Sequence, residues 1–117
     1  MINFEQRQLL HHFILLELAV KSLQTDYQKT EQFKMKNVFL PMMDSLLKEL
    51  RNEYFNFKRQ LAQQRIRVIG LHRVDEYFSD LEIGTAGEDE ILRYSNQALK
   101  IQVELLLTNH INEKMKL

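Results

Sequence analysis

The sequence predicts a mainly α-helical fold: three long helices packed as a bundle, with one β-hairpin between the second and third helices. The 117-residue chain contains only three glycines and one proline, so it has few turn residues and its elements should be long. Apolar residues recur at helical spacing in three segments. A short segment starting at Arg65 instead alternates apolar and basic residues, which is the pattern of a strand.

The first helix is expected to begin at Asn3. Asn3 can cap a helix, and Gln6 stands at the position that completes a capping box. The apolar stripe that follows consists of Leu9, Leu10, Phe13, Leu16, Val20, Leu23 and Tyr27, and it is widened by Ile14, Leu15, Leu18 and Ala19. A helix that is apolar over so much of its circumference is either central in the fold or shared with a second subunit.

Residues 26–37 are polar and rich in lysine, and they are expected to form the end of the first helix and the connection to the second helix. Pro41 suits the first turn of a helix, where its missing N–H costs nothing. The second stripe consists of Met43, Leu46, Leu47, Leu50, Tyr54, Phe57 and Leu61. The alternative is one longer helix that is kinked at Pro41.

The hairpin is predicted from two segments whose apolar residues alternate with charged ones. Aligning their apolar faces places Ile66 opposite Ile83 and Arg67 opposite Glu82, so that the second pair would form a cross-strand ion pair. A competing interpretation remains open. The apolar residues between 74 and 81 also fit helical spacing, so residues 74–83 could form a short helix that ends before Gly84.

The third helix is expected to begin near Thr85. Thr85 and Glu88 have the spacing of a capping box, and acidic residues 88–90 suit the positive end of a helix dipole. Apolar residues then continue from Ile91 to Ile111 and are again too widely distributed for one neighbouring helix. No linker or repeat divides the chain, so residues 1–117 are expected to form a single helical domain.

The charged residues of the hairpin region are segregated by sign. Between positions 58 and 73 every charged residue is basic: Lys58, Arg59, Arg65, Arg67 and Arg73. Between Asp75 and Glu90 every charged residue is acidic. The two blocks neutralise each other if they pair across the hairpin; otherwise the basic strip is exposed to an anionic partner. The formal net charge is zero, so only such a local patch could drive binding to nucleic acid.

No residue pattern indicates catalysis, a cofactor or a metal. The chain has no cysteine, which excludes disulfides and thiolate chemistry. No glutamate stands three residues before any of the four histidines, and His11 and His12 are adjacent and would point about 100° apart on a helix. The glycines at 84 and 87 lack the context of a phosphate-binding loop. The protein is therefore not expected to be an enzyme.

The N-terminal region shows no targeting or membrane-spanning signal. The first residues lack a basic segment, and the apolar run that begins at Phe13 is interrupted by Glu17. We expect a cytoplasmic protein that does not enter a membrane, in agreement with the absence of cysteine. The composition resembles that of small proteins common in bacteria and their mobile elements, but this resemblance rests on no motif.

The sequence thus predicts a small non-enzymatic protein-protein interaction or regulatory protein that forms a homodimer. The apolar circumference of the first and third helices suggests a dimer face made of Phe13, Leu15, Leu16, Leu105 and Leu106. The alternative is a nucleic-acid-binding regulator that uses the basic strip Lys58–Arg73. Aromatic residues on both sides of that strip, such as Tyr54 and Tyr77, could stack on bases, although at helical spacing they more often belong to a core.

Overall fold

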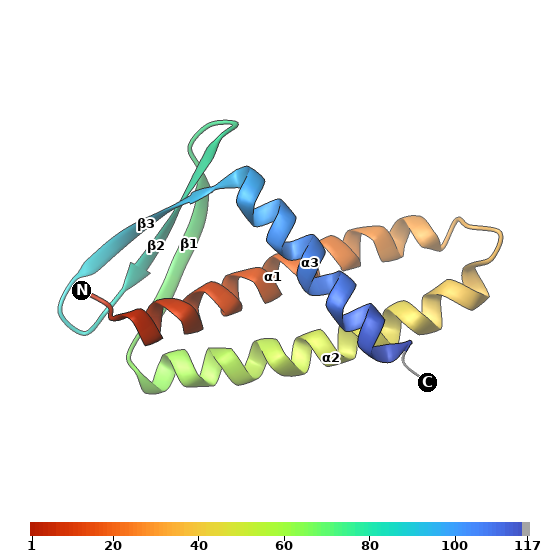
Figure 1. Ribbon diagram of the computed structural model, residues 1–117, viewed down its shortest axis with the longest axis horizontal. Coiled ribbons are helices and arrows are strands. Elements are labelled where there is room, and N and C mark those ends of the chain that lie inside the picture. The colour runs from red at the N-terminus through yellow and green to blue at the C-terminus, as the bar shows by residue number, and fades with distance from the viewer. Residues whose placement is uncertain (116–117) are drawn as a thin grey trace.

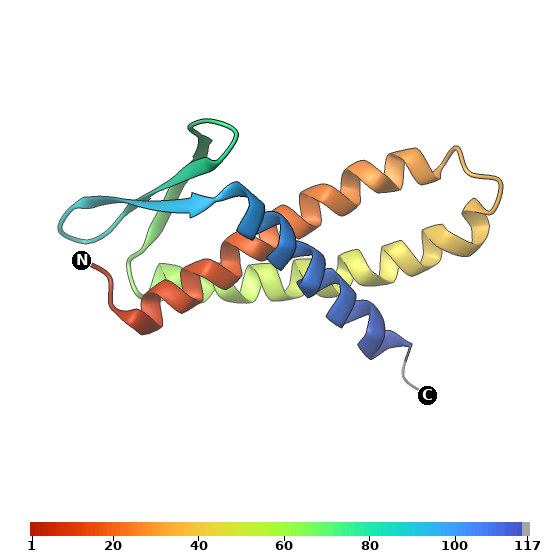
Figure 2. The same ribbon diagram turned by 45° about the horizontal axis from the view of Figure 1, so that its top comes forward.

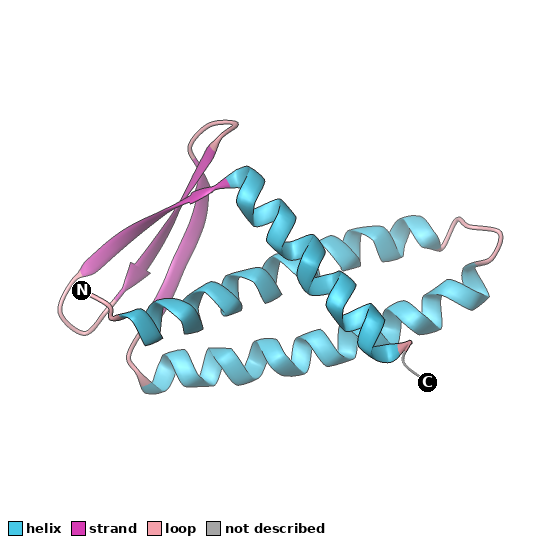
Figure 3. Ribbon diagram, viewed as in Figure 1, coloured by secondary structure: helices cyan, strands magenta, loops and turns pink. Residues whose placement is uncertain are grey.

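The computed structural model describes residues 1–115, which form three α-helices and a three-stranded antiparallel sheet (Figure 1). The elements are α1 (Phe4–Thr30), α2 (Lys36–Gln63), β1 (Arg67–Arg73), β2 (Phe78–Gly84), β3 (Asp89–Ser95) and α3 (Asn96–Lys114). The helices α1 and α2 form an antiparallel pair, and α3 crosses them diagonally in both views (Figures 1 and 2). The sheet lies at the end of the molecule where α1 begins (Figure 3). The prediction of a bundle with a single hairpin is therefore wrong, because a third strand precedes α3.

The central element is α1. Its predicted capping box is present: the Asn3 side chain accepts a hydrogen bond from the Gln6 N–H at 2.8 Å, and the Gln6 side chain accepts one from the Asn3 N–H at 3.0 Å. Its broad apolar surface is buried at Leu10, Phe13, Ile14, Leu15, Leu16 and Ala19. These residues belong to one hydrophobic cluster with residues of α2, α3 and the sheet. The wide apolar stripe is thus explained by neighbours from the same chain that cover α1 on several sides.

The turn between α1 and α2 lies inside the predicted region, but α2 begins earlier in the sequence than predicted. α1 ends at Thr30 and α2 begins at Lys36, so the helices separate over residues 31–35 and not at Pro41. Pro41 lies in the second turn of α2. Its missing N–H therefore removes one hydrogen bond, to the carbonyl of Asn37, that a regular helix would make. Neither the expected first-turn proline nor the alternative helix kinked at Pro41 is correct.

The strands β1 and β2 pair in a register that differs from the prediction. Val68 lies opposite Ile83 and Gly70 opposite Glu82, while Arg67 lies opposite Gly84. The register shifts between Val68 and Gly70, where a β-bulge adds one residue to β1. Ile66 is buried but precedes the strand, because its N–H bonds to the Leu61 carbonyl at the end of α2. The predicted pairing of Arg67 with Glu82 is therefore wrong.

Residues 74–77 form a turn and not a helix. The Asp75 carboxylate accepts hydrogen bonds from the N–H groups of Tyr77 and Phe78, both at 2.8 Å. Aspartate closes turns in this way because its short side chain reaches the backbone two residues onward. Residues 78–84 therefore form a strand, and the alternative short helix over residues 74–83 is wrong.

The segment predicted to open the third helix forms β3 instead. The Thr85 N–H and hydroxyl both donate to the Glu88 carbonyl, at 2.9 and 2.7 Å, and these bonds close a β-turn. Glu90, Leu92 and Tyr94 are half-buried while the residues between them are exposed, so the segment has the period of a strand. α3 begins only at Asn96, with the Ser95 hydroxyl accepting from the Ala98 N–H at 3.2 Å.

The core lies between the sheet and α1 and continues between α1 and α2. Its fully buried large side chains are Leu10, Ile14, Leu16, Leu50, Leu81 and Ile83. Within residues 1–115, none of the helices combines the length and the apolarity that crossing a bilayer requires.

Shortening Leu81 to alanine should reduce the free energy of unfolding by about 2–5 kcal/mol, since Leu81 is fully buried where the sheet meets the helices. The matched control is Ile91→Ala on the neighbouring strand, where the side chain is 65% exposed and the change should be within about 0.5 kcal/mol. Urea unfolding measures both values. Equal effects of the two substitutions would contradict the placement of the core.

Asp80 and Arg93 are register partners that form a cross-strand ion pair, with Arg93 Nε 2.8 Å from Asp80 Oδ1. In a double-mutant cycle, the Asp80→Asn/Arg93→Gln protein should be more stable than the sum of the single losses predicts, because each single substitution already breaks the pair. The same cycle at Arg67 and Glu82, which are not register partners, should show additivity. Coupling at Arg67 and Glu82 instead would indicate the other register.

Candidate functional site

A groove lined by basic side chains lies between the helix pair and β1. Its volume is about 940 Å³. We call it the basic groove, and its cationic residues are Lys21 of α1, Lys58 of α2, Arg65 of the following turn and Arg67 of β1. Its one carboxylate, Glu17, forms an ion pair with Lys21 at 3.4 Å. The groove is therefore electropositive although the whole chain has no net charge.

The structure brings only part of the predicted basic strip together. Lys58, Arg65 and Arg67 line the groove, whereas Arg59 and Arg73 do not. Arg73 lies at the other end of β1 and donates from Nε to the Asp75 carbonyl at 3.0 Å. Among the described residues, the groove cations Lys58, Arg65 and Arg67 have no ion-pair or hydrogen-bond partner within range.

The acidic block does not neutralise the basic block across the hairpin. Asp80 is held by Arg93, whose hydrogen bonds lower the pKa of the carboxyl below its ordinary range. Glu82 lies 3.6 Å from His72, and Glu88 lies 3.0 Å from the N-terminal amino group. Asp80, Glu82 and Glu88 thus have partners outside the groove. Among the residues that the structure describes, the groove cations Lys58, Arg65 and Arg67 stay unpaired.

Two backbone features shape the groove. Arg65 has a positive φ of 58° directly after α2, a position that usually favours glycine because side chains are strained there. Gly84 faces Arg67 across the sheet, and a Cβ at position 84 would lie only 3.2 Å from the Arg67 guanidinium. The missing side chain of Gly84 therefore leaves room for the guanidinium over β2.

The residues predicted to form the dimer face lie in different environments. Phe13, Leu15 and Leu16 are in the core, with exposed fractions of 5%, 7% and 1%. Leu106 is half-buried, and Leu105 is 56% exposed. Leu105 belongs to a row of exposed residues on the side of α3 that faces away from α1: Ala98, Ile101, Leu105, Thr108 and Asn112. We call this row the outer α3 stripe.

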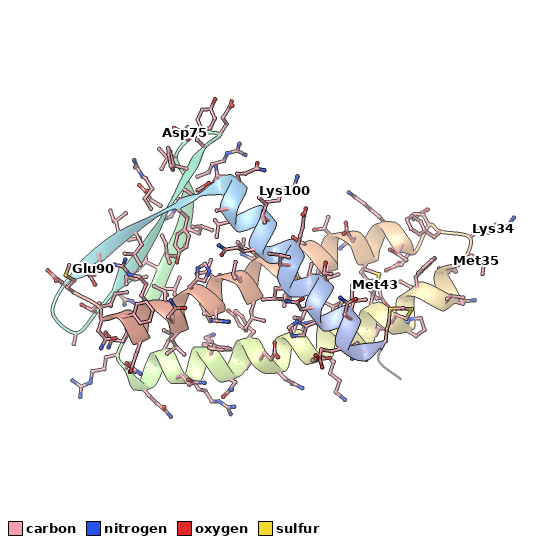
Figure 4. The ribbon with its side chains drawn as sticks, in the orientation of Figure 1. Lys34, Met35, Met43, Asp75, Glu90 and Lys100 are labelled. Atoms are coloured by element: carbon pink, nitrogen blue, oxygen red, sulfur yellow. The ribbon has the colours of Figure 1, made fainter. Side chains whose placement is uncertain are left out.

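A second apolar surface lies at the end of the molecule opposite the sheet. A groove of about 650 Å³ there is lined mainly by Phe33, Phe39, Met42, Met43, Ile111 and Met115. Figure 4 shows Met35 at the turn between α1 and α2 and Met43 beside the C-terminal half of α3.

A cluster of titratable groups joins α3 to α2. His110 Nε2 lies 2.9 Å from Glu53 Oε2 and 4.0 Å from Glu49 Oε1, and Lys114 Nζ lies 2.9 Å from Glu49 Oε2. His110 Nδ1 lies 2.8 Å from the Leu106 carbonyl, which can only accept, so Nδ1 carries a proton. The hydrogen bond to a carboxylate at Nε2 then requires a second proton and hence a charged imidazolium. We call these four side chains the α2–α3 latch.

The electrostatics of the latch support the charged histidine. Burial lowers the pKa of His110, but the hydrogen bonds to Leu106 and Glu53 and the attraction of both carboxylates outweigh it, so the net pKa is raised. With His110 and Lys114 charged, two cations face two carboxylates and the latch is electrically balanced.

The latch also contains donors of the kind that bind a metal. Ligand atoms of Glu49, Glu53 and His110 all lie within 4.8 Å of one another, and Nδ1–H bonded to a backbone carbonyl is the usual support of a metal-binding histidine. However, the Lys114 ammonium already bonds Glu49 and would repel a cation. The arrangement therefore fits an ion-pair network better than a metal centre.

The latch was not predicted from the sequence because its members come from two helices that are distant in the chain. A signal was present: Glu49 and Glu53 are four residues apart, as are His110 and Lys114, so each pair lies on one helix face. By contrast, His11 stacks on Tyr94 of β3 and His12 on Phe57 of α2, with ring centroids 5.8 and 5.5 Å apart. These two adjacent histidines point to different elements, as their spacing predicted.

The family of this chain is shown by a match to a protein-family model. A family model described as "YhjD protein" matches residues 1–115. The chain belongs to the YhjD protein family. No curated protein and no solved structure gives a significant match. The family match covers every helix and strand, so the basic groove, the outer α3 stripe and the latch all lie inside it.

The latch should make stability depend on pH. Because the pKa of His110 is raised above its ordinary value of 6.5, the imidazolium stabilises the fold fully below pH 6.5, and this contribution is lost as the pH rises through the folded-state pKa. The stability lost on His110→Gln should therefore be larger at pH 5.5 than at pH 8.5, as measured by urea unfolding at both values.

An NMR titration of the His110 ring tests the cause of the shift. Glu53→Gln should lower the pKa of His110, whereas Glu104→Gln, which removes an exposed carboxylate elsewhere on α3, should leave it unchanged. A pKa of His110 below 6.5 in the unmodified protein would show that burial outweighs the carboxylates.

Proposed function

We propose that this protein is a small, non-enzymatic cytoplasmic interaction protein that forms a symmetric homodimer through the outer α3 stripe. The observation that carries the proposal is the spacing of that stripe. Its five residues follow one another at intervals of three, four, three and four, which is the seam pattern of paired helices. All five are exposed, so their packing partners do not come from the described part of the chain.

The burial of α3 supports the same conclusion. Only Leu99 and Val103 of its 19 residues are buried, while Ile101 and Leu105 are 46% and 56% exposed. A helix that contacts its own chain with one narrow face leaves a second face for another molecule. In a twofold dimer the same stripe would contact itself, which a single helix can do in an antiparallel pair.

Further exposed apolar side chains lie at both ends of α3. Val74 and Tyr77 are exposed in the turn between β1 and β2. This turn lies beside the start of α3, because the Tyr77 carbonyl accepts a hydrogen bond from the N–H of Asn96. Ile111 and Met115 lie at the other end and are 39% and 65% exposed. A stable interface buries about 800 Å² on each partner, which requires more than Ile101 and Leu105 alone. These flanking residues offer the additional area.

Binding to nucleic acid is the second candidate. The observation that favours it is that Lys58, Arg65 and Arg67 are exposed and unpaired among the described residues. The geometry supports it less than the first candidate, because Arg59 and Arg73 lie outside the groove and no continuous strip results. Phe13 and Tyr54 line the groove but stack on each other with centroids 4.8 Å apart, so neither ring is fully available to a base.

Light scattering at micromolar concentration should give about twice the chain mass of 14.1 kDa. Leu105→Glu should yield a monomer, because it places a charge in the centre of the stripe. Ile91→Glu is the matched control, since Ile91 is an exposed apolar residue on β3, and it should stay dimeric. Circular dichroism verifies that both variants are folded. A wild-type mass of 14.1 kDa at every concentration would refute the dimer.

A further inference from the structure

The basic groove runs along the free edge of β1. Five successive residues of the strand line it: Arg67, Val68, Ile69, Gly70 and Leu71. Successive side chains of a strand point to opposite faces of the sheet, so a groove that touches all five extends along the edge of the strand. It also reaches Gly84 and Thr85 at the end of β2, beside Arg67. The strand order β1-β2-β3 makes β1 an edge strand, and no described residue pairs with its outer side. Outward N–H and C=O groups are thus available inside the groove.

The chemistry of the groove combines positive charge with an apolar floor. Phe13, Leu61 and Ile66 form part of the floor and are 5%, 3% and 5% exposed. Lys58, Arg65 and Arg67 stand on the exposed rim without carboxylate partners among the described residues. A ligand that fits this surface carries negative charge, presents some apolar side chains and has backbone groups that pair with a strand edge.

The backbone conformation of Arg65 is a second observation that points to a functional role of the rim. Its positive φ of 58° costs a residue with a side chain about 1 kcal/mol relative to glycine. Glycine would relieve the strain but would remove a cation from the rim of the groove. Strained backbone conformations of this kind concentrate at functional sites.

We propose that the basic groove binds an extended acidic segment of a partner protein, which adds to the edge of β1 as a further strand. Its carboxylates lie against Lys58, Arg65 and Arg67, and its alternate apolar side chains enter the groove. Main-chain hydrogen bonds supply affinity in this mode of recognition, and the side chains supply specificity. The site is distinct from the outer α3 stripe, so the proposal stands or falls independently of the homodimer.

The same features keep the edge from pairing indiscriminately. The bulge at Ile69 and the arginine at position 67 are devices that blunt an exposed strand edge. Cations on the rim repel basic strands and attract acidic ones. An edge protected in this way is selective for the complementary charge.

The test is fluorescence anisotropy with a labelled peptide of about eight residues in which glutamate and valine alternate. We expect saturable binding to the full-length protein that weakens as salt is added. The Lys58→Gln/Arg67→Gln double variant should bind about tenfold more weakly, since it removes two charge contacts. Arg59→Gln is the matched control, because Arg59 lies beside Lys58 in the sequence but outside the groove, and its affinity should change less than about twofold.

Two further peptides separate charge from backbone pairing. A peptide with lysine in place of glutamate should not bind. A peptide whose alternate amides are N-methylated keeps its charges but loses the hydrogen bonds of one edge, and it should bind at least about tenfold more weakly. Protection of the β1 amides from hydrogen exchange on adding the acidic peptide would locate the complex at this edge.

Three outcomes overturn the proposal. Equal binding of the N-methylated peptide shows that charge alone acts and that β1 is not extended. Equal affinity of the double variant and the wild type places the peptide elsewhere. Tighter binding of single-stranded oligothymidine than of the acidic peptide, lost in the same double variant, assigns the groove to nucleic acid. Because the double variant changes only exposed side chains, circular dichroism should show that it remains folded.

Discussion

The structure depends on the burial of α1 from several sides. Leu10 and Ile14 have no exposed surface, and they share one cluster with side chains of α2, α3 and the sheet. Hydrophobic burial has no preferred direction, so a helix that is apolar around most of its circumference must collect neighbours until the surface is covered. Two helices of a simple bundle leave one side of α1 open near its N-terminus. The sheet closes that side, and this explains why Leu81 and Ile83 are the most deeply buried residues of the strands.

The same requirement leaves other surfaces uncovered. α3 crosses α1 at an angle, so only a short part of its inner face is packed and its outer face stays open (Figures 1 and 2). The side chains of the latch compensate by tying the C-terminal half of α3 to α2 through His110 and Lys114. The position of α3, and with it the proposed dimer face, therefore rests partly on groups whose charge changes with pH. The α2–α3 latch and the outer α3 stripe lie on two sides of the same helix.

The basic and acidic blocks of the sequence do not neutralise each other across the hairpin. Blocks of opposite sign would neutralise each other only if the register of β1 and β2 placed them face to face. The bulge at Ile69 shifts that register, and β3 supplies Arg93 as the partner of Asp80. Asp80, Glu82 and Glu88 thus find cations outside the groove, and the free edge of the sheet keeps its positive charge. Because β3 supplies a partner for an acidic residue of β2, it helps to leave the positive charge at the edge of β1 exposed.

The sequence by itself determined the features that depend on local spacing. The capping box at Asn3, the wide apolar circumference of the first helix, the strand character after Arg65 and the divergence of His11 and His12 all follow from residues a few positions apart. Tertiary structure decided between alternatives where the local sequence fits two different structures. Thr85 and Glu88 bond equally well in a helix cap and in a hairpin turn, so only pairing with β2 selected a strand for residues 89–95. Phe13, Leu15 and Leu16 are as apolar as Leu105, and only packing decided which of them are covered. The latch and the basic groove join residues far apart in the chain, because side chains distant in sequence meet only after the helices and the sheet have packed.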